Sequence, residues 1–358
     1  MNRYAVVMAG GGGTRFWPLS RRQMPKQLLN ISGNDVMLNE TIKRILEMIP
    51  PSNIYVVANR KQTRIINRLL IQEIPRENIL FEPVGRNTAV CIAYAATAIA
   101  QRSRDAVMCV LPSDHHISDV DRFRQVLDHA INAAESIEKL ITIGIKPAFP
   151  STGYGYIKYN SNSGTPCSGV YEAESFIEKP SIDKAVEYVE SGCYLWNSGM
   201  FVWRVSTIMA NLARYLPKLY KSISGLKEII GTDKEQSAVE KVYSGLQSIS
   251  IDFGVLERSD DVFVIPGDFG WNDVGSWDAL GAVIPTDENG NTVMGKHIGI
   301  GTKNTIVYSP NRLIATIGLE DLIIADTSDA LLICPKNKAQ EVRNIVEALK
   351  NTGMEEYI

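Results

Sequence analysis

The segment with the strongest chemical character is glycine-rich and lies near the N-terminus. Four consecutive glycines at 10–13 follow a short apolar run and precede Thr14 and Arg15. Glycines let the backbone pass close to a ligand, and their N–H groups can point at phosphate oxygens. Arg15 adds a bidentate phosphate donor, and Lys26 adds a point charge. The segment lacks the Gly-Lys-Ser/Thr of a P-loop, and GxGxxG would need glycine where Arg15 stands, so it predicts a different kind of phosphate site.

Two aspartates, Asp114 and Asp273, are the candidates for holding a metal ion against such phosphates. Asp114 follows an apolar run that predicts a buried strand, and the ends of such strands are where open α/β sheets bind ligands. Asp273 lies in a glycine-dense loop after another predicted strand. Mg²⁺ prefers one or two carboxylates together with phosphate oxygens. Taken alone, Asp114 is better explained as a helix cap or turn residue, and the adjacent His115 and His116 cannot share a face to bind zinc.

Three shorter segments carry further polar side chains. Glu178 and Lys179 end a predicted strand, where the acid suits sugar hydroxyls and the base suits a sugar phosphate. Asn197 offers an amide for hydroxyl recognition. Glu82 and Asn87 lie close to the start of a predicted helix. Each of these segments alone is more often surface or capping chemistry than a site.

Apolar runs alternate with helical periodicities through the first 145 residues. Strands are expected at 4–9, 54–58, 79–82, 106–111 and 140–145, and helices at 38–49, 61–73, 87–102 and 121–135. This alternation is typical of a largely parallel sheet covered on both faces. Beyond residue 150 we expect a more mixed sheet region, with strands at 153–157, 173–178 and 262–265, a helix at 183–191, and mostly helix at 205–249.

The pattern changes again near residue 286, where glycines interrupt short β-branched runs. Strands are expected at 306–308, 313–317, 322–325 and 330–333, followed by a closing helix at 337–350. The chain therefore divides into a domain at 1–285 and a β-rich domain at 286–358. The glycine spacing resembles a few irregular coils of a hexapeptide-type β-helix.

Composition narrows the class of protein. The chain has 358 residues, 45% of them hydrophobic, and a formal net charge of -3, which gives no indication of a nucleic-acid or membrane partner. Its five cysteines are scattered, odd in number and without a CxxC pair, so neither a disulfide framework nor a zinc site is expected. The apolar N-terminal run is too short for a signal peptide. We expect a soluble cytoplasmic protein.

Taken together, seven strings resemble the mannose-1-phosphate guanylyltransferase family, also called GDP-mannose pyrophosphorylases. They occur in the family's order: AGGGGTRFWPLSRRQMPKQ, EPVGRNTA, LPSDHHI, FIEKP, WNSGMFVW, SIDFGVLER and FGWNDVGSW. The resemblance implies a Rossmann-like nucleotidyltransferase domain with a mixed, mostly parallel sheet, followed by a small left-handed β-helix domain, and a homodimer. Some relatives carry a C-terminal isomerase domain. The sequence ends at residue 358, so we expect no isomerase activity here.

The resemblance also implies a reaction and its residues. An oxygen of mannose 1-phosphate would attack the α-phosphorus of GTP in line, and pyrophosphate would leave. Arg15 and Lys26 would brace the phosphates, Mg²⁺ would lie between Asp114 and Asp273, and Lys179 would hold the sugar phosphate. Mannose hydroxyls would be bound by Gly153, Glu178 and Asn197, and guanine N1 and N2 by Glu82. The nucleotide-binding set would comprise Ala9, Gly10, Gly11, Gly12, Gly13, Thr14, Arg15, Glu82, Asn87, Ser113 and Asp114.

Three alternatives stay open from the residues. The first is a sibling sugar nucleotidyltransferase with another sugar or base. The second is a non-catalytic regulatory homologue, which the presence of Arg15, Lys26, Asp114, Lys179 and Asp273 disfavours. The third is a metal-dependent glycosyltransferase, whose DxD motif is not matched by Asp-His-His at 114–116.

Overall fold

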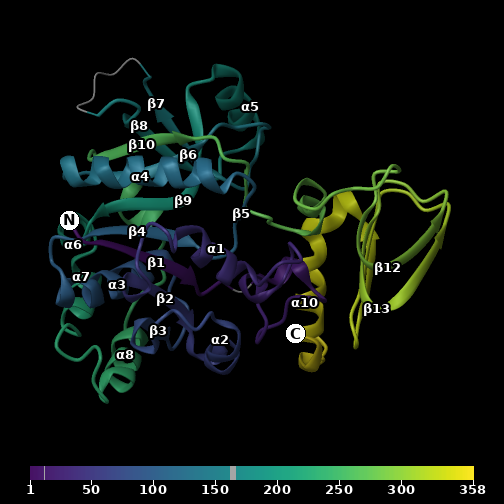
Figure 1. Ribbon diagram of the computed structural model, residues 1–358, viewed down its shortest axis with the longest axis horizontal. Helices are drawn as coiled ribbons and strands as arrows, with labels where there is room; N and C mark the ends of the chain where they lie inside the picture. The colour runs from purple at the N-terminus through teal and green to yellow at the C-terminus, as the bar shows by residue number, and fades with distance from the viewer. Residues whose placement is uncertain (12, 162–166) are drawn as a thin grey trace.

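The computed structural model describes residues 1–11, 13–161 and 167–358, and its largest element is a nine-stranded mixed sheet (Figure 1). The strands run in the order β3-β2-β1-β4-β9-β6-β10-β8-β7. Their bounds are β1 Arg3–Ala9, β2 Ile54–Asn59, β3 Ile79–Glu82, β4 Val107–Pro112, β6 Leu140–Ile145, β7 Gly155–Tyr159, β8 Tyr171–Glu178, β9 Tyr194–Arg204 and β10 Val262–Gly267. The helices around it are α1 Met37–Ile45, α2 Thr63–Leu69, α3 Thr88–Arg102, α4 Val120–Ser136, α5 Ile182–Ser191, α6 Val205–Tyr215, α7 Pro217–Ser224, α8 Glu235–Ser244 and α9 Ile251–Gly254.

Strands β3, β2, β1 and β4 form the parallel part of the sheet, as the alternation of strand and helix predicts. Side chains of β1 alternate between two cores, because successive residues of a strand point to opposite faces. Ala5 and Val7 pack with α1 and α4 on one face, and Tyr4 and Val6 pack with α3 and α6 on the other. The sheet is therefore covered on both faces, and its strand ends are left for a ligand.

Strand β9 is the central element that the sequence did not predict. It is antiparallel to both β4 and β6 and lies in the middle of the sheet. Because it is buried on both faces over most of its length, it lacks the alternation that marks a half-buried strand. Gly199 also adopts a left-handed φ of 69°, and the β6–β9 register shifts between Thr142 and Gly144. This irregularity turns Asn197 and Ser198 toward the pocket described below.

Two short strands outside the main sheet connect the segments that carry the two candidate metal ligands. These strands are β5, His116–Ile117, and β11, Trp271–Asn272, and they pair in antiparallel fashion. Asp114 lies two positions before β5, and Asp273 directly follows β11. The pairing therefore brings the two aspartates to the same end of the molecule.

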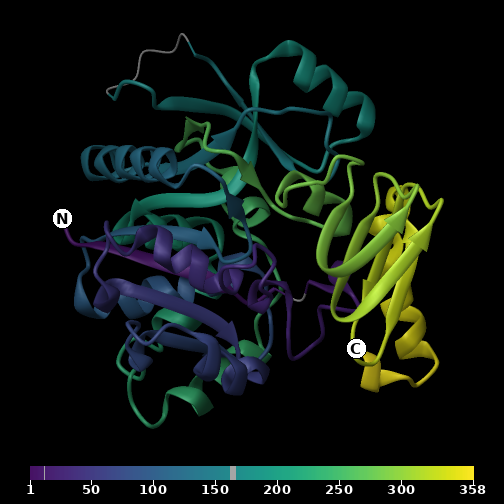
Figure 2. The ribbon, with the colours of Figure 1, turned by 45° about the vertical axis from the view of Figure 1, so that its right-hand side comes forward.

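The C-terminal part is a four-stranded sheet closed by a helix, set to one side of the main sheet (Figure 2). Its parallel strands are β12 Thr292–Ile300, β13 Ile306–Ile317 and β14 Leu322–Asp326, and β15 Leu331–Pro335 is antiparallel to β14. The two strands expected at 306–308 and 313–317 are one strand, β13. A 3-10 segment at Lys336–Glu341 leads into α10, Val342–Asn351. The boundary at 285 and the left-handed winding stay predictions.

A shared apolar core joins the C-terminal part to the glycine-rich segment. Phe16 and Trp17 pack in one cluster with Val342 and Val346 of α10. The indole N–H of Trp277 donates to the Trp17 carbonyl over 3.0 Å. Figure 1 shows α10 between the C-terminal strands and the segment that follows β1. The C-terminal part therefore supports the loop that carries Arg15.

Candidate active site

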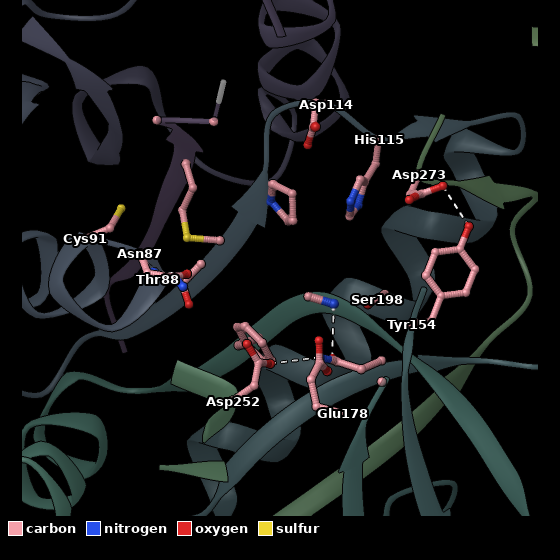
Figure 3. Close-up of a pocket in the computed structure, with 18 of the residues that line it drawn as sticks. Asn87, Thr88, Cys91, Asp114, His115, Tyr154, Glu178, Ser198, Asp252 and Asp273 are labelled. Atoms are coloured by element: carbon pink, nitrogen blue, oxygen red, sulfur yellow. Dashed lines mark hydrogen bonds between the residues drawn. The ribbon is translucent and has the colours of Figure 1, made fainter. Parts of the chain in front are cut away.

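A cavity of about 370 Å³ opens at the carboxyl ends of β1, β3 and β4 and extends along β9. Figure 3 shows Asp114, His115 and Asp273 on one side of it and Asp252, Glu178 and Ser198 on the other. The expected site residues among its lining are Gly10, Gly11, Glu82, Asn87, Asp114, Gly153, Glu178, Asn197 and Asp273. Residues from distant parts of the first domain thus meet in one pocket.

The end of this cavity that holds Asp114 and Asp273, called the phosphate end after its expected ligand, borders the buried ammonium group of Lys26. Its Nζ lies 3.0 Å from Asp114 Oδ2 and also donates to the backbone carbonyl of Asp273. Burial favours the neutral form of Asp114, but the charge and hydrogen bond of Lys26, with smaller contributions from His115 and the backbone, together lower the pKa of Asp114 below its usual value. Asp114 is therefore ionised at neutral pH, as a metal ligand has to be.

The neutral side chains of Tyr154 and His115 flank the two aspartates at the same end. Tyr154 donates its O–H to Asp273 Oδ1 over 2.7 Å, and the Trp271 indole donates to Nδ1 of His115 over 3.1 Å. Burial lowers the pKa of His115 to about 4, so its ring is neutral at physiological pH. An uncharged histidine adds no cation to the charges that Lys26 already supplies.

Arg15 approaches the two aspartates through a smaller adjoining cavity of about 160 Å³. This cavity is also lined by Gly13, Lys26, Asp114 and Asp273. Arg15 Nη1 donates to Oε1 of Gln340 over 3.3 Å. Gln340 in turn donates to the hydroxyl of Ser276 over 2.7 Å. The C-terminal part thereby contributes a contact to the arginine that the sequence marks for phosphate binding.

Side chains around the glycine-rich loop hold its backbone in place. Gln27 Nε2 donates to the carbonyls of Ala9 over 2.6 Å and Gly11 over 3.0 Å. Gly13 has a left-handed φ of 57°, and a Cβ there would lie 2.6 Å from Cβ of Lys26. A side chain at position 13 would therefore displace the lysine. Gly12 lies outside the described residues.

Three residues of the expected nucleotide set lie near the loop but do not present side chains to the main cavity. Ala9 is fully buried in β1. Ser113 is 1% exposed and donates its hydroxyl to the Met8 carbonyl over 2.7 Å. Thr14 lines a separate cavity with Gly10 and Gly11. For Ala9 and Ser113 the structure thus gives structural contacts between β1 and the end of β4.

Glu82 forms a different end of the cavity, at the carboxyl end of β3. Its Oε1 accepts the O–H of Tyr243 over 2.9 Å, while Oε2 lies 3.1 Å from where a Cβ on Gly10 would be. Burial raises the pKa of Glu82 to about 7. Asn87 nearby has a φ of 67°, and its side chain accepts the Thr88 N–H over 2.8 Å, capping α3. Asn87 is thus both a helix cap and a cavity residue.

The third end holds Glu178 and Asn197 against the turn before β7. A Cβ on Gly155 would meet Glu178 Oε2 at 2.4 Å and Cβ of Asn197 at 3.3 Å, so only glycine leaves room here. Lys179 Nζ lies 3.0 Å from Glu178 Oε1, and its side chain is 62% exposed. Lys179 thus stands at the rim, whereas Glu178, at 12% exposed, reaches inside.

Sequence reasoning assigned no role to three residues that the fold brings to this site: Tyr154, Tyr243 and Asp252. Tyr154 and Asp252 line the cavity, and Tyr243 holds Glu82 from behind. The sequence carries a weak indication for Tyr154, because Tyr154 is next to Gly153 in a turn that the sequence marks for sugar binding. Tyr243 had none, since its partner is 161 residues away.

The candidate metal-binding pair is Asp114 and Asp273. Within the ranges that the structure describes, no group of three or more His, Cys, Asp or Glu side chains is placed to hold a metal ion. Two carboxylates on a phosphate-binding cavity are nonetheless the donor set that Mg²⁺ uses when phosphate oxygens complete its shell. The residues present therefore fit this ion. Among the described residues, no helix has the length and apolar character needed to cross a membrane.

The fold is an α/β sheet with a cavity at the ends of its strands, and a β-rich part packs against the glycine loop. A family model described as "Nucleotidyl transferase" matches residues 4–290, and one described as "MannoseP isomerase/GMP-like beta-helix domain" matches residues 295–349. The chain belongs to the nucleotidyl transferase family and carries that β-helix domain.

Two relatives and one solved structure are similar to this chain over nearly its whole length. The mannose-1-phosphate guanylyltransferase of Escherichia coli is 39% identical over 362 residues, which cover 99% of this chain and 75% of the relative. The alginate biosynthesis protein AlgA of Pseudomonas aeruginosa is 37% identical, over 98% of this chain and 73% of the relative. A Thermus thermophilus structure, described as a mannose-1-phosphate geranyltransferase, has a TM-score of 0.87 at 35% identity and covers 98% of this chain and 100% of the other.

Proposed function

We propose that the protein transfers GMP from GTP to α-D-mannose 1-phosphate, forming GDP-mannose and pyrophosphate. The observation that carries this proposal is one cavity lined by Asp114, Asp273, Glu82 and Glu178, with Lys26 held against both aspartates in the adjoining smaller cavity. Such a cavity offers cationic and metal-binding groups to phosphates, and separate polar ends to a base and a sugar. Relatives named as mannose-1-phosphate guanylyltransferases support the choice of substrates.

The proposed chemistry needs positioning and charge neutralisation rather than a covalent intermediate. A phosphate oxygen of mannose 1-phosphate attacks the α-phosphorus of GTP in line, and the bond to pyrophosphate breaks. Lys26 and Arg15 stabilise the negative charge on the phosphate oxygens, and the loop N–H groups add further donors. Asp114 and Asp273 would hold Mg²⁺, which supplies additional charge neutralisation at the phosphates when bound.

The two outer ends would select the substrates. Glu82 would accept from N1 and N2 of guanine, because those atoms are donors that adenine does not present in the same arrangement. Asn87 would contact the nucleotide nearby. Glu178, Asn197 and the Gly153 turn would bind mannose hydroxyls, and Lys179 at the rim would hold the sugar phosphate.

We also propose a homodimer and a cytoplasmic location. The β-helix domain exposes large apolar side chains on three of its strands, an unusual feature for a surface in contact with water. They are Ile298, Ile300, Leu313, Ile317, Leu331 and Ile333. A second copy of the chain would cover them. A cytoplasmic enzyme would draw GTP directly from the nucleotide pool.

The direct test is product identification with purified protein, Mg²⁺, GTP and mannose 1-phosphate. We expect GDP-mannose and pyrophosphate in equal amounts, and neither product when either substrate is left out. A folded protein that binds GTP but releases no pyrophosphate would contradict the proposal and favour a regulatory binding role.

A further inference from the structure

One carboxylate in the cavity, that of Asp252, has no part in the roles given above. Asp252 lies in the short helix α9, whose preceding segment is fixed to the start of α3. Ile249 N–H donates to the Arg86 carbonyl over 3.2 Å, and Ile251 N–H donates to Thr88 Oγ1 over 2.8 Å. The backbone around Asp252 is therefore held in place, and its carboxylate lies near Glu178 in the cavity (Figure 3). Asn197 also lines this cavity.

The hydrogen bonds of Asn197 show why an extra acceptor matters. Asn197 Oδ1 accepts the Gly199 N–H over 3.1 Å, and it shares the Thr142 hydroxyl with the Met200 carbonyl, each at 3.3 Å. Its Nδ2 donates to Asp252 Oδ1 over 2.9 Å. An asparagine amide has two acceptor sites and two N–H groups. Asn197 can therefore offer a ligand one N–H, while its oxygen is already engaged by the Gly199 N–H.

The charged acceptors at this end are carboxylates. Glu178 is one, but its Oε1 already pairs with Lys179. Asp252 is the other, and burial together with the nearby charge of Glu178 raises the pKa of Asp252 to about 6. A ligand hydroxyl that donates to Asp252 would relieve this cost, because hydrogen bonds to the charged form stabilise it.

We propose that Asp252 is a specificity-determining residue that binds a pair of adjacent sugar hydroxyls together with Asn197. The carboxylate of Asp252 accepts the O–H of one hydroxyl, and the remaining N–H of Asn197 donates to the oxygen of its neighbour. Asp252 also fixes the orientation of the Asn197 amide through their mutual hydrogen bond. This inference rests on the proposed function only in taking a sugar phosphate as the occupant of this end.

The test combines Asp252→Asn with deoxy analogues of the sugar phosphate. The variant should raise KM for mannose 1-phosphate by about 10- to 100-fold, the range for losing one hydrogen bond to a charged group. KM for GTP should stay unchanged. The control is Asp260→Asn, an exposed aspartate in the following loop, which should behave as wild type.

Deoxy analogues separate hydroxyl recognition from a structural role. With the monodeoxy sugar that lacks the hydroxyl bound by Asp252, wild type and Asp252→Asn should become nearly equal, while the other deoxy sugars retain the difference. If Asp252→Asn raises KM by the same factor for every analogue, or if it raises KM for GTP, the proposal is overturned.

Wild-type protein keeps the inference testable if Asp252→Asn does not fold. Removing either of two adjacent hydroxyls should then raise the KM of the wild-type protein for the sugar phosphate. If the two hydroxyls whose removal raises KM are not adjacent, the proposed pair is refuted. If mannose 1-phosphate itself is not a substrate, the proposed function fails. The inference is then tested separately, with deoxy analogues of whichever sugar 1-phosphate the protein does turn over.

Discussion

Asp114, at the proposed phosphate end of the cavity, and Glu82 and Asp252, at its two proposed recognition ends, are held in opposite ways. At the phosphate end, Asp114 is paired with the ammonium group of Lys26 and its pKa is lowered. At the recognition ends, Glu82 and Asp252 are held by the neutral donors Tyr243 and Asn197, and burial raises their pKa to about 7 and about 6. The same type of group is thus kept charged in one place and costly to charge in the other.

This difference matches what each end is proposed to bind. Phosphate groups carry charge that is redistributed during transfer, so fixed cations and ionised metal ligands are useful there. A base and a sugar present neutral N–H and O–H donors, which a buried, weakly stabilised carboxylate binds strongly because each new hydrogen bond offsets part of its desolvation. Discrimination by such buried acceptors is sharp, since a ligand without the donor leaves the carboxylate unsatisfied.

The largest effect should come from the phosphate end. Asp114→Asn removes a charged metal ligand and leaves the buried Lys26 without its counter-ion, so we expect kcat to fall by about 10²- to 10³-fold or more. Pyrophosphate release at increasing Mg²⁺ concentrations measures this. Asp121→Asn, at an 88% exposed side chain, is the matched control. Near-wild-type turnover of Asp114→Asn would remove Asp114 from the metal site.

The next effect should come from the base end. Glu82→Gln keeps the shape but loses the charged acceptor, so kcat/KM for GTP should fall by about 10²-fold and selectivity over ATP should shrink. Steady-state kinetics with both nucleotides measure this change. Equal losses for GTP and ATP would contradict base recognition by Glu82.

Glu82→Gln should also change stability in a pH-dependent way. The folded pKa of about 7 exceeds the usual 4.5, so the unfolded chain loses this proton first as pH rises. The contribution of Glu82 to wild-type stability therefore declines between about pH 4.5 and pH 7, and Glu82→Gln should be the more stable protein at pH 8 by up to about 3 kcal/mol. The two proteins should match near pH 4. Urea unfolding at both pH values measures it, and a variant that is less stable at pH 8 would contradict the buried-carboxylate account.

A smaller effect is expected at the rim. Lys179→Ala should raise KM for mannose 1-phosphate by about tenfold, because a partly exposed cation contributes less than a buried one. Lys158→Ala is the control, since Lys158 is also a half-exposed lysine in an ion pair, with Glu174. Unchanged KM and kcat in Lys179→Ala would refute its role in holding the sugar phosphate.

The smallest effect should come from the contact between the two parts of the chain. Gln340→Ala frees Arg15 from the C-terminal segment, and we expect kcat to fall by a few-fold, about the value of one neutral-to-charged hydrogen bond at an exposed position. Lys338→Ala, at an exposed residue of the same segment, is the control. Identical kcat values for Gln340→Ala and wild type would confine the C-terminal part to packing.

The sequence predicted those parts of the site that are encoded locally. The glycine loop, Lys26, Asp114 and Glu178 each follow or end a segment whose pattern is readable, and the structure brings them together. Strand β9 was missed because burial on both faces and the left-handed Gly199 hide its period. Tyr243 and Gln340 were missed because their partners lie 161 and 325 residues away, so that only tertiary packing gives them a role.

The most direct test of the account is kcat/KM for GTP, ATP, UTP and dTTP, each paired with mannose 1-phosphate and with glucose 1-phosphate, measured by pyrophosphate release. We predict the highest kcat/KM for GTP with mannose 1-phosphate. The fold-decreases in kcat/KM for a wrong base and for a wrong sugar should multiply, because separate ends of the cavity bind the base and the sugar. A higher value for any other pair, or equal values for GTP and ATP, would contradict it.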